Sequence, residues 1–219
     1  KGYEHVVRKM FWETITIGHP LKFDLNCARQ YENLGLSWYL KEGSNDCVVA
    51  LVDNEPVGYC LVCTDTESFE RSQKLLLARL FICGLFVLLT GRINSESRRF
   101  YWYRLRDSVT IMRTRKHLPN DVHMHAHLNV HYSHHDGSIS RRLRDHADAV
   151  CKAHGANAYF GEMNAVGGKR IIGLQRVGGA VVSDSTNHTF SWLTGQDIHR
   201  LTLIRFLEPP VTQSEKQAA

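Results

Sequence analysis

One junction between a strand and a helix constrains the fold of this chain more than any other feature. In the segment HLNVHYSHHDGSISRRL, residues 127–143, Leu128 and Val130 alternate with polar residues, as at the end of a β-strand. Ile139 and Leu143 then begin an apolar face with helical spacing, and this helix ends before Gly155. The polar loop between them therefore leads into a helix N-terminus, where backbone N–H groups and the helix dipole favour an anion.

The pattern around this junction predicts an α/β domain. Before it we expect helices at residues 3–18 and 23–40, a β-hairpin at 47–64 around the turn-forming DNEP, and a helical region at 65–117. That region is expected to break at Gly84 and Gly91, and to begin either at a capping box of Thr64 and Glu67 or at Asp65 as the cap. After the junction we expect a strand at 156–163, a short helix at 164–179 and one or two further strands, the clearest at 199–207. The 219 residues suit one domain, residues 1–210, with a helical insertion at about 65–117 and a polar tail at 211–219.

Charge and cysteine content set mild limits. The formal net charge of +5 suits a polyanionic ligand but excludes little. Six cysteines at irregular spacing, with no recognisable secretory signal, favour reduced thiols in a protein of the cytoplasm or nucleus. Cys60 and Cys63 form a CxxC, but residues three apart on a strand point to opposite faces, so we expect no metal or redox role there.

The most apolar run, LLLARLFICGLFVLL, covers residues 75–89. A membrane span requires about 20 apolar residues, and Arg79 interrupts this one. We therefore expect a helix that is buried or lies in an interface, and no membrane contact.

The strand, loop and helix of the junction resemble the central motif of the GNAT superfamily, the acyl-CoA-dependent N-acyltransferases. The family pattern is roughly Arg/Gln-x-x-Gly-x-Gly/Ala, and here HHDGSISRRL places His135 at the basic position and Ser138 and Ser140 at the two glycines. The hairpin VVALVDNEPVGYCLV is similar to the second and third strands of the family. CTDTESFE, the helical insertion and LPNDVHMHAHLNV resemble a subgroup that includes the acetyltransferase-like domain of some O-GlcNAcases. The resemblance covers roughly residues 1 to 207. It implies a mixed, mostly antiparallel sheet flanked by helices, with the helical insertion after the third strand.

The resemblance also implies a function and a cofactor site. Acetyl-CoA, as co-substrate, would lie between the fourth and fifth strands, and an amine of a small molecule or peptide would attack its thioester directly. The backbone of the fourth strand, at Asn129 and Val130, would bind the pantetheine, and the loop amides from His135 to Arg141 would bind the pyrophosphate. The implied cofactor-binding residues are Leu128, Asn129, Val130, His135, Asp136, Gly137, Ser138, Ile139, Ser140, Arg141, Asn164 and Gly167.

The catalytic base has three candidates, Glu162, His125 and His127, all on the strands that would flank the thioester. The family's usual proton-donating tyrosine falls on Leu174, which leaves Tyr159, Tyr132 or water to protonate the thiolate. The usual asparagine falls on Gly167, with Asn164 three residues earlier. An alternative is therefore a catalytically weak or inactive relative that binds acyl-CoA or a protein partner.

Two other functions compete with this interpretation. His123, His125 and His127 share one strand face and could hold zinc, but neighbours about 7 Å apart along a strand rarely converge on one metal, so we expect no metal site. The basic segment 92–116 carries Tyr101, Trp102 and Tyr103 among its arginines and could bind nucleic acid. No recognised nucleic-acid motif accompanies it, so an amphipathic insertion with a solvated arginine face is the preferred interpretation. The sequence does not identify the acceptor or the oligomeric state.

Overall fold

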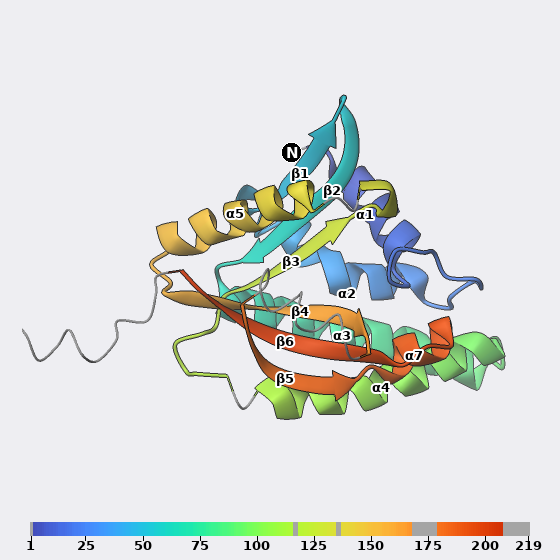
Figure 1. Ribbon diagram of the computed structural model, residues 1–219. Coiled ribbons are helices and arrows are strands. Elements are labelled where there is room, and N and C mark those ends of the chain that lie inside the picture. Colours follow the sequence, from blue (N-terminus) through green and yellow to red (C-terminus); the bar gives the residue numbers. More distant parts are fainter. Residues whose placement is uncertain (1, 116–117, 135–136, 168–178, 208–219) are drawn as a thin grey trace, which may run out of the picture.

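The computed structural model describes residues 2–115, 118–134, 137–167 and 179–207 (Figure 1). Six strands form one sheet in the order β1-β2-β3-β4-β6-β5. Every neighbouring pair is antiparallel except β3 and β4, which are parallel. The expected mixed, mostly antiparallel sheet is therefore confirmed.

The helices and strands follow the predicted order with a few differences. The helices are α1 (Glu4–Thr14), α2 (Ala28–Leu40), α3 (Thr66–Leu89), α4 (Ser95–Arg115), α5 (Ser138–Ala153) and α7 (His188–Thr194), with short 3-10 turns at Ser44–Asp46 and Tyr132–His134. The strands are β1 (Val48–Val52), β2 (Glu55–Cys63), β3 (His125–Val130), β4 (Ala158–Val166), β5 (Ala180–Thr186) and β6 (Ile198–Phe206). The expected hairpin is β1–β2, which turns at Asp53 and Asn54, both with positive φ, as a two-residue hairpin loop requires.

Several predicted boundaries were wrong. The second helix begins at Ala28, after Cys27 in a left-handed conformation, and Phe23 lies before it and packs against Phe100 and Trp192. Helix α3 continues through Gly84, where the good helix formers on both sides outweigh a cost of about 1 kcal/mol, and the break falls only at Gly91. The expected short helix at 164–179 is strand as far as Val166, and residues 168–178 lie outside the described residues. The polar tail 211–219 also lies outside them.

The cap of α3 is Asp65, whose side chain accepts a hydrogen bond from the Ser68 amide. The alternative capping box does not form, because the Thr64 hydroxyl donates to Asp46 instead.

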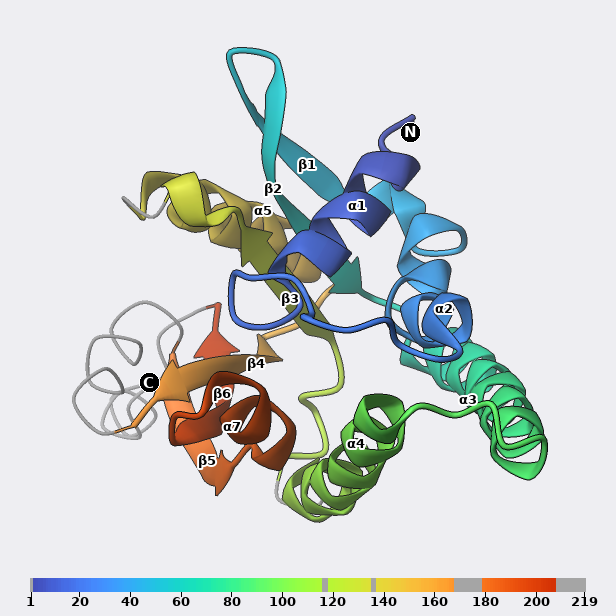
Figure 2. The same cartoon turned by 90° about the vertical axis from the view of Figure 1, so that its right-hand side faces the viewer.

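Helices cover both faces of the sheet (Figures 1 and 2). On one face, Ile139, Leu143, Ala147 and Cys151 of α5 recur every four residues and pack against Cys60, Val62 and Ala126 of the sheet. On the other face, α1, α2 and the start of α3 pack against Tyr59, Leu61 and Cys63 of β2. Cys60 and Cys63 thus belong to opposite cores, as predicted for the CxxC, and burial raises the pKa of both thiols.

Helices α3 and α4 occupy the region expected to be helical after β2. Cys83 of α3 forms a disulfide with Cys27, at a Cα–Cα distance of 6.1 Å, so the expectation of reduced thiols was wrong for this pair. The remaining cysteines, at 47, 60, 63 and 151, are free.

Helix α4 is attached to α7 through the buried side chain of Asp107. The fully buried carboxylate of Asp107 accepts hydrogen bonds from the amides of His188 and Thr189 and from the Thr189 hydroxyl, at the N-terminus of α7.

Candidate functional site

The site begins where the sheet opens between its two parallel strands. β3 and β4 are paired at a single position, His125 with Phe160, and diverge from there. Beyond that point the sheet consists of two three-stranded halves, β1-β2-β3 and β4-β6-β5 (Figure 1).

The edge of β3 facing this gap carries backbone groups without a strand partner. The Asn129 carbonyl points toward β2, since a Cβ on Gly58 would lie 2.8 Å from it, and the His131 amide donates to Val57 of β2. Hydrogen-bonding direction alternates along a strand, so Leu128 and Val130 turn their N–H and C=O groups toward the gap. The sequence placed backbone pairing at Asn129 and Val130; the geometry favours Leu128 and Val130.

A cavity of about 290 Å³ occupies the gap. Its walls come from β3 and β4, from the start of α5 and from β6. The lining residues are Ala126, Leu128, Asn129, Val130, Gly137, Ser140, Arg144, Tyr159, Gly161, Glu162, Met163, Leu203 and Arg205.

The N-terminus of α5 closes one end of this cavity. Gly137 is the N-cap with φ 83°, a left-handed conformation that glycine adopts without strain, and its carbonyl accepts the first helical hydrogen bond from the Arg141 amide. Backbone amides in the first turn of a helix have no carbonyl acceptor within the helix, and this makes a helix N-terminus suited to binding an anion. Ser140 and Arg144 lie one turn apart on the side of α5 that faces the cavity.

The other side of the cavity holds a fixed polar group. Arg205 of β6 binds Asp148 of α5 through two guanidinium nitrogens, at 2.7 Å each, and the Tyr159 hydroxyl donates to the same carboxylate at 2.8 Å. Burial, and then this hydrogen bond and the negative charge of Asp148, raise the pKa of Tyr159. Tyr159 is therefore a poor proton donor, which weakens its candidacy as the acid that protonates a thiolate.

A second cavity, of about 500 Å³, lies on the side of the sheet covered by α1 and α2. It meets the first at five shared residues, Leu128, Asn129, Val130, Glu162 and Met163. Its other walls are Phe11, Thr14, Ile15, Ile17, Gly18, Tyr31, Gly35, Leu36, Tyr59, Leu61, Arg104, His127, Asn164, Phe190 and Arg200. Asn129 is oriented by its side-chain amide, which donates to Thr14 Oγ1 at 2.5 Å and to Tyr59 Oη at 3.1 Å.

Glu162 stands where the two cavities meet. Among the described residues it is the only carboxylate that lines either cavity. Its Oε2 lies 3.7 Å from Nε of the buried Arg200. Burial lowers the pKa of Arg200, and the neighbouring Glu162 carboxylate opposes this shift.

The two histidine candidates for the base separate in the structure. His127 is exposed and lines the second cavity. His125 is buried among Tyr39, Phe69 and Phe160, hydrogen-bonds the Tyr39 hydroxyl at 2.7 Å, and lines neither cavity. The structure therefore places His125 in the core, because it precedes the point where β3 and β4 diverge.

The predicted cofactor residues are likewise only partly brought together. Leu128, Asn129, Val130, Gly137 and Ser140 line the first cavity; Ser138 begins α5 beside them, Ile139 is buried in the core, and Arg141 is exposed away from the lining. Asn164 lines the second cavity instead and accepts a hydrogen bond from Asn187, while the Gly167 amide donates to Asp197 at the end of β4. His135, Asp136 and Leu174 lie outside the described residues, as does the side chain of Tyr132.

The competing functions find little support. Within the described parts of the chain, no three His, Cys, Asp or Glu residues are placed to hold a metal ion. The aromatic residues of α4 do not form one stacking surface: Tyr101 donates its hydroxyl to the Asn26 carbonyl, Tyr103 packs against Trp192, and Trp102 alone is largely exposed.

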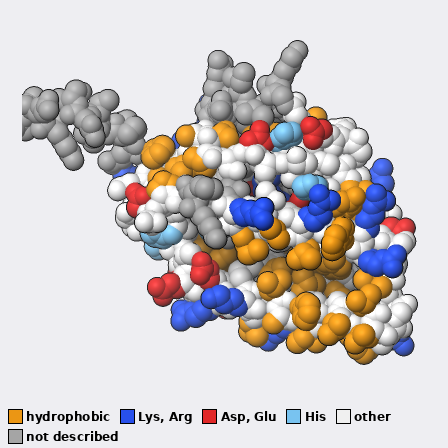
Figure 3. Space-filling model, turned by 90° about the horizontal axis from the view of Figure 1, so that it is seen from below, with side chains coloured by type: hydrophobic (Ala, Val, Ile, Leu, Met, Phe, Trp, Pro, Cys, Tyr) orange, Lys and Arg blue, Asp and Glu red, His pale blue; other side chains and the backbone are white. Residues whose placement is uncertain are grey.

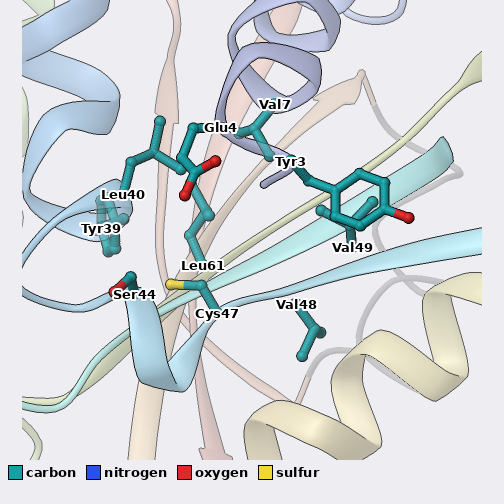
Figure 4. A pocket seen from close by; sticks show the side chains of 10 residues that line it. All are labelled: Tyr3, Glu4, Val7, Tyr39, Leu40, Ser44, Cys47, Val48, Val49 and Leu61. Carbon is teal, nitrogen blue, oxygen red and sulfur yellow. The ribbon is translucent and has the colours of Figure 1, made fainter. Parts of the chain in front are cut away.

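A third, small cavity of about 40 Å³ lies between the start of α1, the end of α2 and β1 (Figure 4). Its thiol, Cys47, donates to the Gly43 carbonyl at 3.3 Å, and burial raises the pKa of Cys47 to about 11. This thiol is protonated at neutral pH, and the cavity is too small for a substrate.

Four arginines of the two cavities were missed by sequence analysis. Arg144 had a usable signal, since it lies four residues after Ser140 and so shares its face of α5. Arg205, Arg200 and Arg104 reach the site from β6 and α4, which are brought there only by the tertiary fold.

Comparisons with known proteins agree on the architecture. Neither family models nor curated proteins match the sequence. Solved structures do match the fold: SsHAT at 13% identity and a TM-score of 0.57, covering 94% of both chains, and an agmatine N-acetyltransferase at 12% identity and 0.55, covering 94% of this chain and 95% of that one. The polyamine N-acetyltransferase of Drosophila melanogaster matches at 13% identity and 0.51, with 94% and 95% covered. The parallel strands β3 and β4 diverge, a helix N-terminus lies at the gap between them, and the solved structures that match are N-acetyltransferases such as the agmatine enzyme. The chain therefore has the fold of the GNAT-type N-acetyltransferases.

Proposed function

We propose that this protein is an acetyl-CoA-dependent N-acetyltransferase that transfers an acetyl group directly to an amine. The observation that supports this most is the pair of cavities meeting at Glu162, one along the open edge of β3 and one on the opposite side of the sheet. Such a pair suits a reaction in which two substrates approach one centre from opposite sides.

The residues of the first cavity suit acetyl-CoA. Arg144, Arg205 and the first turn of α5 supply positive charge and N–H groups for its phosphates, and the edge of β3 supplies hydrogen bonds for its amide-containing arm. When bound, acetyl-CoA would supply an activated acyl group as a thioester. The N–H of Leu128 or Val130 would donate to the acyl oxygen, where negative charge develops.

Glu162 acts as the base, directly or through a water molecule. It accepts the proton that the amine loses as its nitrogen bonds to the acyl carbon and the bond to sulfur breaks. The guanidinium of Arg200 lies 3.7 Å from this carboxylate and complements its negative charge. Water protonates the departing thiolate, because the tyrosine lining the first cavity, Tyr159, is held by Asp148.

The second cavity favours an acceptor amine that also carries a negative group. Arg104 and Arg200 outnumber Glu162 among its charged side chains. Arg200 is paired with Glu162, whereas Arg104 forms no ion pair with any described carboxylate and lies over the Tyr31 ring at 5.8 Å. A carboxylate or phosphate on the acceptor would complement Arg104, while a polyamine would be repelled.

The second candidate is a protein that binds acyl-CoA without turnover, favoured by the absence of a well-placed acid in the described cavity. Calorimetry with acetyl-CoA followed by thiol release with a panel of amines separates the two. Binding with turnover supports the enzyme, and binding without turnover on any amine supports the second candidate. If CoA at millimolar concentration neither binds nor shifts the amide signals around Gly137, both proposals fail.

A further inference from the structure

Helix α3 exposes its apolar distal half. It is long and apolar enough to cross a membrane by length and composition, with mean hydropathy 1.8 over its best window and only 6% of that window buried. The exposed fractions of Phe81, Ile82 and Leu89 are 68%, 66% and 77%. Of the two expectations for this helix, burial in the core is therefore wrong, and a position in an interface stays a prediction. A helix that is apolar on all sides normally lies in a protein core or in lipid.

Helix α4 adds a second apolar strip. Trp102, Leu105, Val109 and Met112 recur at intervals of three and four residues and are all exposed. Figure 3, which views the molecule from the side where α4 lies lowest in Figure 1, shows hydrophobic side chains gathered over much of this face, with Lys and Arg side chains around them. Such an area on a soluble monomer indicates an interaction surface. We call the exposed apolar residues of α3 from Leu75 onward, together with this strip, the α3–α4 face.

The charges around this face are mostly positive. From Lys74 to Arg113 there are eight Lys and Arg residues against two acidic ones, Glu96 and Asp107, and Asp107 is buried against α7. Arg98, Arg106 and Arg113 are exposed on α4 within four residues of Trp102 or Val109, so they flank the strip. In a two-fold dimer the same face would meet itself and place arginines opposite arginines, whereas an anionic lipid surface complements them.

The anchorage of α3 favours lying on a bilayer over crossing it. Its first half is fixed to the domain by buried Phe69 and Leu76 and by hydrogen bonds of Ser68 and Gln73 to α2. Its second half is tied to the start of α2 by the Cys27–Cys83 disulfide. Arg79 lies within the apolar stretch, where crossing would bury its charge in hydrocarbon.

We propose that the α3–α4 face docks on the surface of a membrane containing anionic lipid. The apolar side chains of α3 and the Trp102 strip insert at the level of the headgroups, and the flanking arginines bind lipid phosphates or carboxylates. Arg104, which lines the second cavity, lies on a different side of α4 from the strip, so docking leaves the acceptor cavity uncovered.

The test is co-sedimentation with vesicles of phosphatidylcholine alone and of phosphatidylcholine with phosphatidylserine. We expect the disulfide-intact protein to bind the anionic vesicles only, and to be released by salt. Changing Arg98, Arg106 and Arg113 together to Gln should weaken binding by about a hundredfold, at about 1 kcal/mol for each charge. The matched triple variant Lys41→Gln, Arg142→Gln, Lys152→Gln, at exposed sites outside this face, should bind as the wild type does.

A second measurement tests the apolar contact directly. Brominated lipid should quench tryptophan fluorescence in the wild type and much less in Trp102→Phe. Phe81→Asp, at a largely exposed site, should keep the melting temperature and lose vesicle binding. The proposal would be overturned by equal binding to neutral and anionic vesicles, or by no vesicle binding at all. It would also be overturned by a concentration-dependent dimer that Phe81→Asp dissociates, which would identify a second copy of the chain as the partner of this face.

Discussion

The carboxylate of Glu162 lies 3.7 Å from the Arg200 guanidinium at the one place where the two large cavities meet. β4 supplies the carboxylate and β6 the guanidinium, in strands paired along their whole length, so the sheet fixes both. The carboxylate proposed as the base is thereby oriented by a side chain from the neighbouring strand.

Glu162→Gln removes the base while keeping the side-chain shape. We expect kcat to fall by about 10²- to 10⁴-fold, since this is the usual contribution of a positioned base, with little change in the Kd for acetyl-CoA. Thiol release and calorimetry measure the two quantities. His127→Gln is the comparison. If it lowered kcat as much as Glu162→Gln does, the role of base would be assigned to His127 instead.

Arg144 is predicted to bind a phosphate of CoA. Its replacement by Gln should raise the Kd for CoA by roughly 10- to 100-fold, because a hydrogen bond to a charged group is worth about 1.5–3 kcal/mol. Arg142→Gln makes the same charge change two residues earlier, at an exposed position outside the cavity, and should leave the Kd unchanged. Equal effects of the two variants would indicate general attraction by the basic helix and argue against a specific contact.

The positions of these residues show what the sequence could and could not predict. The junction between β3 and α5 was recognisable because alternation, a polar loop and a helical apolar face follow one another within 30 residues. Similar local patterns predicted the β1–β2 hairpin and β6, the last strand along the chain. Solved structures with this fold share only 12–13% sequence identity with the chain, so very different side chains are compatible with the same backbone arrangement.

The charged lining of the second cavity had no such local signal. Arg104 looked like one member of a solvated arginine run, and it reaches the cavity only because Asp107, three residues later, fixes α4 to α7. His125 and His127 looked equivalent on one strand face, and they differ because β3 and β4 are paired at the first and apart at the second. The exposure of α3 was equally hidden, since an apolar run does not reveal whether protein covers it.

Arg104 should select the acceptor. If the protein is the proposed acetyltransferase, we expect the wild type to prefer amines that carry a carboxylate over agmatine. Arg104→Glu should reverse this order in kcat/KM. Arg113→Glu makes the same charge change on the same helix but outside the cavity, so it should preserve the wild-type order of preference. If the wild-type protein instead turned over agmatine faster than amines that carry a carboxylate, the acceptor assignment would be contradicted. The acetyltransferase proposal would stay intact. No turnover of any amine would contradict that proposal itself.

Asp107 should make the attachment of α4 to α7 sensitive to acid. Burial favours the protonated form, but hydrogen bonds from the Thr189 hydroxyl and amide and from the His188 amide, together with the charge of Arg200, outweigh it and lower the pKa of Asp107 below 3.8. A carboxyl group with a lowered folded-state pKa contributes stability above its unfolded pKa and loses it as the pH falls through the folded value. Thermal unfolding should therefore show a loss of stability below about pH 4, near the usual pKa of an aspartate.

Asp107→Asn tests this assignment, because the amide nitrogen would face the donors of α7. We expect a loss of about 2–4 kcal/mol at neutral pH, as for a buried donor left without an acceptor, and a smaller further loss on acidification than in the wild type. Asp145→Asn, at an exposed site on α5, is the control for the charge change. If wild type and Asp107→Asn lost stability in parallel between pH 6 and pH 3, on the order of the range where carboxylates titrate, the acid sensitivity would belong to other groups.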